Sequence, residues 1–292
     1  IMRTIRIGSR DSKLAIIQAQ MVASAIKSYD KNIQTSLVLM KTTGDKILDR
    51  TLDQIGGKGL FVKELDEALL DNQVDITVHS FKDLPMELNP NLPIVAVSER
   101  EDPRDVLLLS SGNTDNIIGC SSKRRSIQLK QLGYKDIKSL RGNVLTRVSK
   151  LDAGEYSGIV LAAAGIKRLG LTGRIAKYFE TDEILPAACQ GILAVQSRSG
   201  EDTDYLRGFH SVQTAVIAAA ERAFVRELEG GCSSPMAAYA YIMGKTLVLE
   251  GMYVDERNQS VFKGRRTGDL EEAEQLGREL ANSLKMEAGI NE

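Results

Sequence analysis

The chain has 292 residues, of which 42% are hydrophobic and 26% are charged, and this composition is typical of a globular protein with a well-formed core. Its length exceeds the roughly 100–200 residues of one domain, so we expect two or three domains. The formal net charge of −1 gives no global attraction for nucleic acid or membrane surfaces, so any anion site has to be local.

Short strands alternate with helices in the first hundred residues. The apolar runs and the turn residues between them predict strands at residues 4–7, 37–40, 76–79 and 94–97. Ser12 or Asp11 is the expected N-cap of a helix after the first strand. Its predicted buried face consists of Leu14, Ile17, Met21 and Ala25. With a second helix at 62–70, the alternation predicts a mostly parallel sheet covered by helices.

The same alternation starts again after residue 102. Strands are predicted at residues 106–109, 117–119, 137–140 and 158–162, and helices at 125–132, 144–153 and 164–169. Residues 186–196 resemble a turn followed by a strand. We therefore expect a second α/β domain, joined to the first by two crossing segments near residues 98–104 and 186–196, as in two-lobed solute receptors.

The last eighty residues have a different pattern. A long helix is predicted at 212–228, three alternating strands at 238–242, 247–253 and 261–265, and a final helix at 270–286. Strands grouped between two helices indicate a small α+β domain. The expected fold is therefore α/β, with two periplasmic-binding-protein-like α/β domains (1–98 plus 191–210, and 99–190) and a small α+β domain (211–292).

The cysteines and histidines argue against disulfides and metal sites. Cys120, Cys189 and Cys232 are odd in number and far apart, which favours reduced thiols in a cytoplasmic protein. His79 and His210 are also far apart in the sequence, and neither belongs to a His-Glu-x-x-His pattern, so no metal is expected. The longest apolar stretch is well short of the roughly 18 residues of a membrane span, and no signal core is present, so we expect no membrane association.

Arginines gather at predicted strand-to-helix junctions. Arg10 lies at the first junction, Arg124 and Arg125 follow Ser122, Arg141 and Arg147 flank the start of the next helix, and Arg168 follows Gly165. Helix N-termini offer backbone N–H groups, and guanidinium groups bind carboxylates in pairs of hydrogen bonds. Because these junctions meet at the carboxyl ends of the strands, they predict a cleft for a polyanion. With only 5% aromatic residues, a small polycarboxylate fits better than a nucleic acid.

Lys82 and Asp83 lie side by side at the end of the third predicted strand, just before Pro85. There they could supply a cation for a carboxylate, and a carboxylate for a proton or a positive intermediate. A surface ion pair in a turn explains the pair equally well.

Cys232 follows two glycines at the end of a long predicted helix. The glycines would leave the thiol on an open turn, where it could be an attachment point or a nucleophile. The alternative is a small residue in a helix-terminating turn.

Taken together, these segments resemble the porphobilinogen deaminase (hydroxymethylbilane synthase) family of tetrapyrrole biosynthesis over nearly the whole chain. The resemblance is carried, in order, by residues 56–65, 78–85, 99–105, 121–125, 139–147, 163–170 and 228–232. It implies a transferase that joins four porphobilinogen molecules head to tail, with loss of ammonia, and releases the linear tetrapyrrole hydroxymethylbilane. It also implies a dipyrromethane cofactor, bound through a thioether to Cys232, as the primer.

The resemblance assigns roles to individual residues. Asp83 matches the catalytic carboxylate. The implied cofactor-binding residues are Lys82, Asp83, Ser122, Arg124, Arg125 and Arg147, together with Cys232. The implied substrate-binding residues are Arg10, Ser12, Lys58, Arg141 and Arg168. The sequence departs from the common family pattern at Cys120, Cys189, Ser233 and Ser234, without loss of a charged group.

One alternative from another class stays open at this point. Two α/β lobes around a cleft are also typical of proteins that bind a small anion without catalysis. The third domain with Cys232 and the lack of a signal core argue against it. We expect a monomer in the cytoplasm with porphobilinogen as its partner and with no metal, nucleic acid or membrane.

Overall fold

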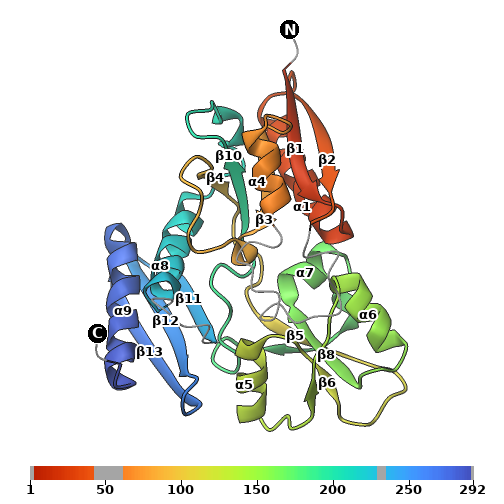
Figure 1. The fold of residues 1–292 in the computed structure, drawn as a ribbon, viewed down its shortest axis with the longest axis vertical. Coiled ribbons are helices and arrows are strands. Elements are labelled where there is room, and N and C mark those ends of the chain that lie inside the picture. The colour runs from red at the N-terminus through yellow and green to blue at the C-terminus, as the bar shows by residue number, and fades with distance from the viewer. Residues whose placement is uncertain (1–2, 43–61, 229–234, 291–292) are drawn as a thin grey trace.

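The computed structural model describes residues 3–42, 62–228 and 235–290. These residues form two mixed α/β lobes and a smaller α+β unit, arranged as a triangle in Figure 1. The predicted fold class is confirmed in its arrangement of two α/β lobes and one small α+β unit. No helix in the described part of the chain combines the length and the apolar character needed to cross a membrane.

The first lobe contains a five-stranded sheet. Its strand order is β2 (Gln34–Met40), β1 (Thr4–Arg10), β3 (Ile76–Ser80), β10 (Leu193–Ser197) and β4 (Ile94–Val97). Its helical segments are α1 (Lys13–Tyr29), α4 (Lys63–Leu70), η1 (Phe81–Asp83) and η3 (Asp204–Leu206). β1 pairs in parallel with β2 and β3, whereas β10 runs antiparallel to β3 and β4. The prediction of a mostly parallel sheet is therefore wrong for this half of the sheet, because β10 returns from the second lobe in the opposite direction.

The second lobe repeats this plan. Its strand order is β7 (Ile137–Lys138), β6 (Ile118–Gly119), β8 (Gly158–Ala162), β5 (Asp105–Leu109) and β9 (Ile175–Phe179). Its helices are α5 (Lys123–Gln131), α6 (Val144–Asp152), α7 (Ala163–Arg168) and η2 (Thr172–Arg174). β5 runs antiparallel to both of its neighbours. The sequence did not predict β9, an edge strand whose short segment alternates weakly between buried and exposed residues.

The third unit is an antiparallel sheet with two helices on one face (Figure 1). It consists of α8 (Val212–Leu228), β11 (Met236–Met243), β12 (Thr246–Asp255), β13 (Ser260–Asp269), η4 (Leu270–Glu272) and α9 (Ala273–Glu287). Phe224 of α8 and Leu280 of α9 are fully or almost fully buried between the helices and the sheet. Their burial supplies the apolar core of this unit.

The helix α1 shows how the sequence sets a local element. Ser12 caps it, because the Ser12 Oγ accepts a hydrogen bond from the backbone N–H of Ala15 at 3.3 Å. The predicted buried face is wrong. Ala19, Val22 and Ile26 are fully buried, whereas Met21 is 41% exposed. Apolar residues cover more than one stripe of this helix, so their spacing alone did not identify the stripe that packs on the sheet.

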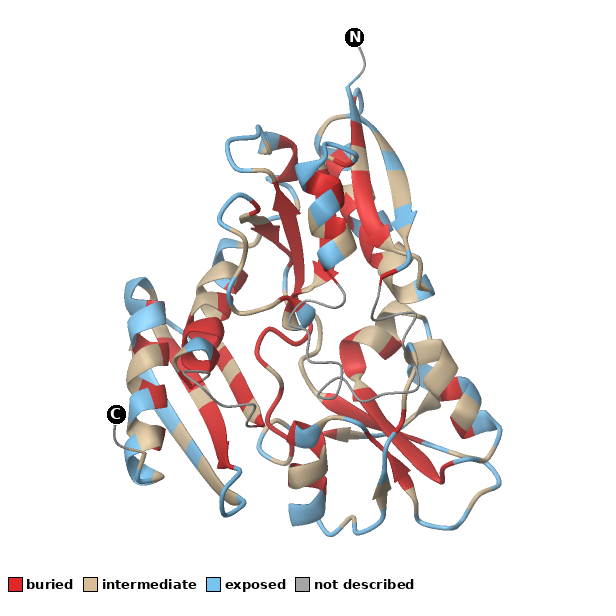
Figure 2. Ribbon diagram, in the orientation of Figure 1, coloured by how far each residue is buried: buried red, intermediate tan, exposed pale blue. Residues whose placement is uncertain are grey.

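Two segments cross between the lobes, as predicted. They touch where the backbone N–H of Glu101 donates to the carbonyl of Gly191 at 3.1 Å. Gly191 has a φ of +92°, and a Cβ there would lie 2.3 Å from the Glu101 carbonyl oxygen. Buried residues concentrate in the central strands and at these crossings (Figure 2).

Candidate active site

A cleft of about 560 Å³ lies between the two α/β lobes, where β1 and β3 end and α6 and α7 begin. Its lining contains seven described basic residues: Arg10, Lys41, Lys82, Arg125, Arg141, Arg147 and Arg168. Among the described lining residues only Asp11 and Asp83 are acidic. The cleft therefore carries a local excess of positive charge on a chain whose formal net charge is −1.

Helix starts position several of these side chains. Asn143 caps α6, since its Oδ1 accepts from the N–H of Thr146 at 3.0 Å. Arg147 lies one turn into α6 and donates from Nε to the carbonyl of Gly142 at 2.7 Å. This leaves the rest of the Arg147 guanidinium group directed to the cleft that it lines. Burial lowers the pKa of Arg147, and the nearby Arg125 charge lowers it further.

Arg168 reaches the cleft from the end of α7. It donates from Nη1 to Gln18 Oε1 at 3.2 Å and from Nη2 to the carbonyl of Gly191 at 2.7 Å. The buried Nε atoms of Arg168 and Arg141 have no hydrogen-bond partner among the described residues. Unsatisfied buried donors are costly, and carboxylate oxygens would satisfy them.

Lys82 and Asp83 form the turn η1 at the end of β3. Phe81 is buried and anchors this turn, whereas Asp83 is exposed. The Nζ of Lys82 donates to Gln190 Oε1 at 3.3 Å. His79 precedes the turn, but burial lowers its pKa to about 3, and the Arg10 charge contributes. His79 is therefore neutral, and Asp83 is the acidic side chain that this turn presents to the cleft.

A buried network supports the cleft from the second lobe. Asp105 is completely buried and pairs with Arg124 at 2.8 Å and with Arg125 at 2.7 Å. Gln190 donates to Asp105 at 3.0 Å and accepts from Lys82, so it links the network to η1. Burial alone would raise the pKa of Asp105, but the two guanidinium groups reverse this and hold it far below its usual range.

The structure separates the predicted binding residues into two groups. Eight of them line the cleft: Arg10, Ser12, Lys82, Asp83, Arg125, Arg141, Arg147 and Arg168. Ser122 and Arg124 do not line it. The Oγ of Ser122 caps α5, and Arg124 donates to Asp105 and to the carbonyl of Leu185. Cys232 and Lys58 lie outside the described residues.

Comparison with known proteins decides the family. A family model described as the dipyrromethane cofactor-binding domain of porphobilinogen deaminase matches residues 5–206, and the model of its C-terminal domain matches residues 215–286. The chain belongs to the porphobilinogen deaminase family. The porphobilinogen deaminase of Ruminiclostridium josui is 58% identical over 292 residues, which cover 99% of this chain and 100% of the relative. The porphobilinogen deaminase of Alkaliphilus oremlandii is 56% identical over 292 residues, which cover 98% of this chain and 98% of the relative.

A solved structure with a remote likeness is the methionine-binding protein MetQ. It has a TM-score of 0.44 and 12% identity, and the match covers 70% of this chain and 88% of MetQ.

Membership of the porphobilinogen deaminase family makes the protein a transferase of tetrapyrrole synthesis with porphobilinogen as substrate and dipyrromethane as cofactor. The cleft fits such a group. Pyrroles of this pathway carry acetate and propionate side chains, and the cleft has excess cations and unsatisfied arginine donors for them.

Sequence reasoning missed several residues of the site. Asp105 and Gln190 connect the basic residues, and Gln18 and Lys41 line the cleft. A charged residue at the start of a strongly apolar strand was a usable signal for Asp105, because such a residue is buried only with a partner. Gln190 carried no comparable signal, since its role depends on two lobes meeting.

Lys82 leads to a prediction on pH dependence. Burial and the nearby Arg125 charge lower its pKa to about 8, although Asp83 partly opposes this. The protonated amine binds a carboxylate and the neutral amine does not, so kcat/KM should decline as pH rises through about 8. Lys82→Arg keeps its charge to much higher pH. Its profile of kcat/KM against pH should therefore remain flat where the parent profile falls, and equal declines in both proteins would contradict this role.

Proposed function

We propose that this chain builds hydroxymethylbilane in the cleft between the α/β lobes, with the dipyrromethane cofactor attached to Cys232 and with Asp83 as the catalytic carboxylate. The observation that carries this proposal is the placement of Asp83 in a cleft that is lined by seven basic residues. Cations bind the substrate carboxylates, and the carboxylate of Asp83, at the end of β3, serves the reacting centre.

The chemistry at Asp83 follows from charge. Loss of ammonia from the aminomethyl group of porphobilinogen breaks a C–N bond and leaves a cationic pyrrole. A carboxylate beside this cation lowers its energy. When the new C–C bond forms, the attacking α-carbon releases its proton, and Asp83 can accept and relay it. When bound, the dipyrromethane supplies the nucleophilic carbon that starts the chain.

Each set of binding roles uses residues from both lobes. We assign Lys82, Ser122, Arg124, Arg125 and Arg147 to the cofactor, and Arg10, Ser12, Lys58, Arg141 and Arg168 to the substrate. Arg124 and Ser122 act indirectly in this proposal. Arg124 shares Asp105 with Arg125, and Ser122 accepts a hydrogen bond from the backbone N–H of Arg125 at 3.4 Å.

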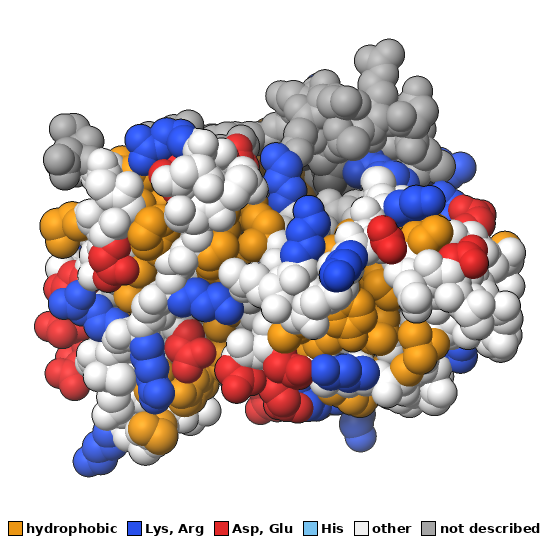
Figure 3. Space-filling view, turned by 90° about the horizontal axis from the view of Figure 1, so that it is seen from below, with side chains coloured by type: hydrophobic (Ala, Val, Ile, Leu, Met, Phe, Trp, Pro, Cys, Tyr) orange, Lys and Arg blue, Asp and Glu red, His pale blue; other side chains and the backbone are white. Residues whose placement is uncertain are grey.

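The same proposal covers domains and partners. We divide the chain into residues 1–98 with 191–210, 99–190 and 211–292, in agreement with the strands that share each sheet. We propose that the chain acts as a monomer, with porphobilinogen as its partner. A cytoplasmic location is supported by the free, buried thiols of Cys120 and Cys189. On the face in Figure 3, basic and acidic side chains are interspersed, which supports the absence of nucleic acid as a partner.

Family membership favours the enzyme over a non-catalytic anion-binding protein. The decisive measurement for Cys232 is the intact mass of purified protein. The parent should carry an adduct equal to two linked pyrroles, and Cys232→Ser should carry none and form no tetrapyrrole. An adduct that persists in Cys232→Ser would contradict the attachment site, and a parent without any adduct would contradict the covalent primer.

A further inference from the structure

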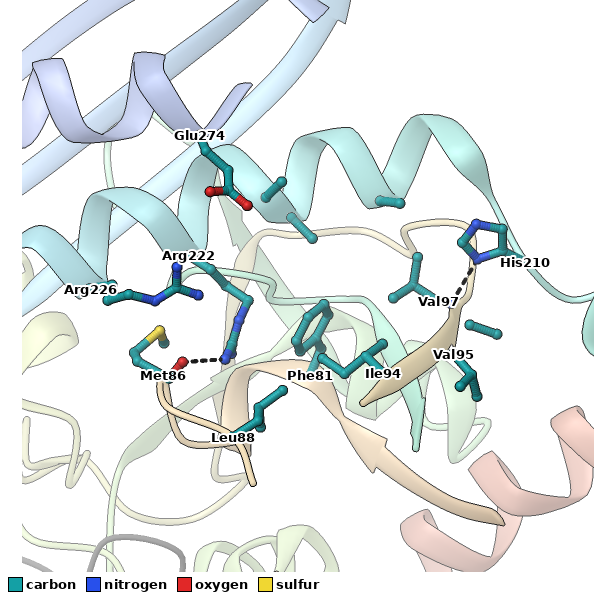
Figure 4. A pocket seen from close by; sticks show the side chains of 14 residues that line it. Phe81, Met86, Leu88, Ile94, Val95, Val97, His210, Arg222, Arg226 and Glu274 are labelled. Atoms are coloured by element: carbon teal, nitrogen blue, oxygen red, sulfur yellow. Dashed lines mark hydrogen bonds between the residues drawn. The ribbon is translucent and has the colours of Figure 1, made fainter. Parts of the chain in front are cut away.

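Arg222, on the helix α8, lies directly behind the turn that carries Lys82 and Asp83. It is only 5% exposed. Its Nη2 donates to the carbonyls of Pro85 at 2.7 Å and Met86 at 3.0 Å. Its guanidinium group also lies 4.8 Å from the centroid of the Phe81 ring. Figure 4 shows Arg222 pointing from α8 to this segment, with the Phe81 ring beside it.

These contacts bracket the catalytic turn. Phe81 begins η1, and Pro85 and Met86 follow it, so Arg222 holds the segment on both sides of Asp83. The Asp83 carboxylate has no hydrogen bond to another side chain among the described residues and is exposed. Its location therefore depends on the backbone of the turn, and Arg222 restrains that backbone.

Apolar packing restrains only part of this segment: Phe81 and Leu84 are buried in one cluster with Ala218 of α8. Beside this cluster, a cavity of about 440 Å³ is lined by α8, β4 and the segment that follows η1. Among the described residues, α8 contributes only the small side chains of Ala215, Ala218 and Ala219 to its wall besides two arginines. Small side chains beside an open cavity form few van der Waals contacts. The hydrogen bonds and the ring contact of Arg222 therefore bridge a region where packing is incomplete.

α8 also leads toward the proposed attachment residue. It ends at Leu228, and Cys232 follows four positions later in the sequence. We propose that Arg222 is a positioning residue, which holds the turn of Asp83 at a set place relative to the helix that leads to the cofactor cysteine. This inference rests on the proposed role of Asp83 and goes beyond it.

The matched pair Arg222→Ala and Arg226→Ala tests the inference. Arg226 lines the same cavity one helical turn later, is exposed, and donates to no carbonyl of the described turn. For Arg222→Ala, with the cofactor loaded as judged by intact mass, kcat should fall about 10- to 100-fold, because a small misplacement of a catalytic group costs that much. KM for porphobilinogen should change little, since the cleft arginines are untouched. Arg226→Ala should match the parent in both constants.

Two additional measurements separate positioning from stability and from the role of Asp83. Guanidinium chloride at millimolar concentration should restore part of kcat in Arg222→Ala, because the deletion opens space beside the cavity, and should restore none in Asp83→Ala. If Arg222→Ala does not fold, Arg222→Met, which keeps a long side chain but has no N–H donor, is judged by the same fall in kcat. If Asp83→Ala is inactive but a cofactor-loaded Arg222 variant has the parental kcat, the inference on Arg222 is wrong. An active Asp83→Ala instead overturns the proposed catalytic role itself.

Discussion

Asp83→Ala is expected to keep its fold and its covalent cofactor but to lose turnover by about 10²–10⁴-fold, the usual contribution of a positioned acid–base group. Asp83 is exposed at the end of η1, so its removal leaves no cavity and no buried unsatisfied partner. The loss arises at the reacting centre, where no other acidic residue of the turn can stabilise the cationic pyrrole. Steady-state rates of tetrapyrrole formation and the intact mass of the purified variant measure both parts of this result.

Asp11→Asn is the comparison for Asp83→Ala. Asp11 lines the same cleft but lies at the start of α1, away from η1. Asp11→Asn should retain most of the parental turnover, because we expect catalysis to depend on a carboxylate at the position of Asp83 and not on negative charge anywhere in the cleft. Near-normal rates for Asp83→Ala, or equal losses in both variants, would show that Asp83 has been assigned wrongly.

Asp105→Asn is expected to lower the free energy of unfolding by about 3–5 kcal/mol, the range for breaking a buried ion pair from one side. The substitution removes the only carboxylate among the described contacts of Arg124 and Arg125, which are themselves 6% and 7% exposed. Two guanidinium groups then remain buried without a paired carboxylate. Chemical denaturation at neutral pH measures the loss.

The control for Asp105→Asn is Asp152→Asn, which breaks an exposed pair with Arg174 and should lower the free energy of unfolding by at most about 1 kcal/mol.

The stabilisation by Asp105 depends on pH with a definite sign. The pKa of Asp105 is lowered in the folded state, so its stabilisation is complete above the unfolded value of about 4 and is lost as pH falls below it. The difference between parent and Asp105→Asn should therefore narrow in acid. A difference that is constant across this range would contradict the ionic origin of the effect.

The sequence predicted much of the basic side of the cleft. Arg10, Arg141 and Arg168 were selected because they follow strands or begin and end short helices, and the structure places all three along one cleft. Within each lobe this succeeds because the ends of neighbouring strands meet at one edge of a sheet, and the packing of the two lobes brings those edges together at the cleft. Their individual roles stay predictions.

Other features depended on contacts between distant segments. The antiparallel insertion of β10 between β3 and β4, the edge strand β9 and the buried stripe of α1 were not predicted or were predicted wrongly. Each is decided by which surface a segment meets, and local periodicity does not contain that information.

From the amino-acid sequence alone follow the α/β class, the third α+β unit, the local concentration of positive charge and the resemblance that family membership confirms. These properties arise from patterns within short segments, such as apolar periodicity, capping residues and motif order. Only the tertiary structure shows that Asp105 neutralises Arg124 and Arg125, that Gln190 joins this network to Lys82, and that Arg222 holds the turn of Asp83. The Asp105 pairs form when β5 and α5 pack within the second lobe, and the contacts of Gln190 and Arg222 exist only once the lobes and α8 have packed together.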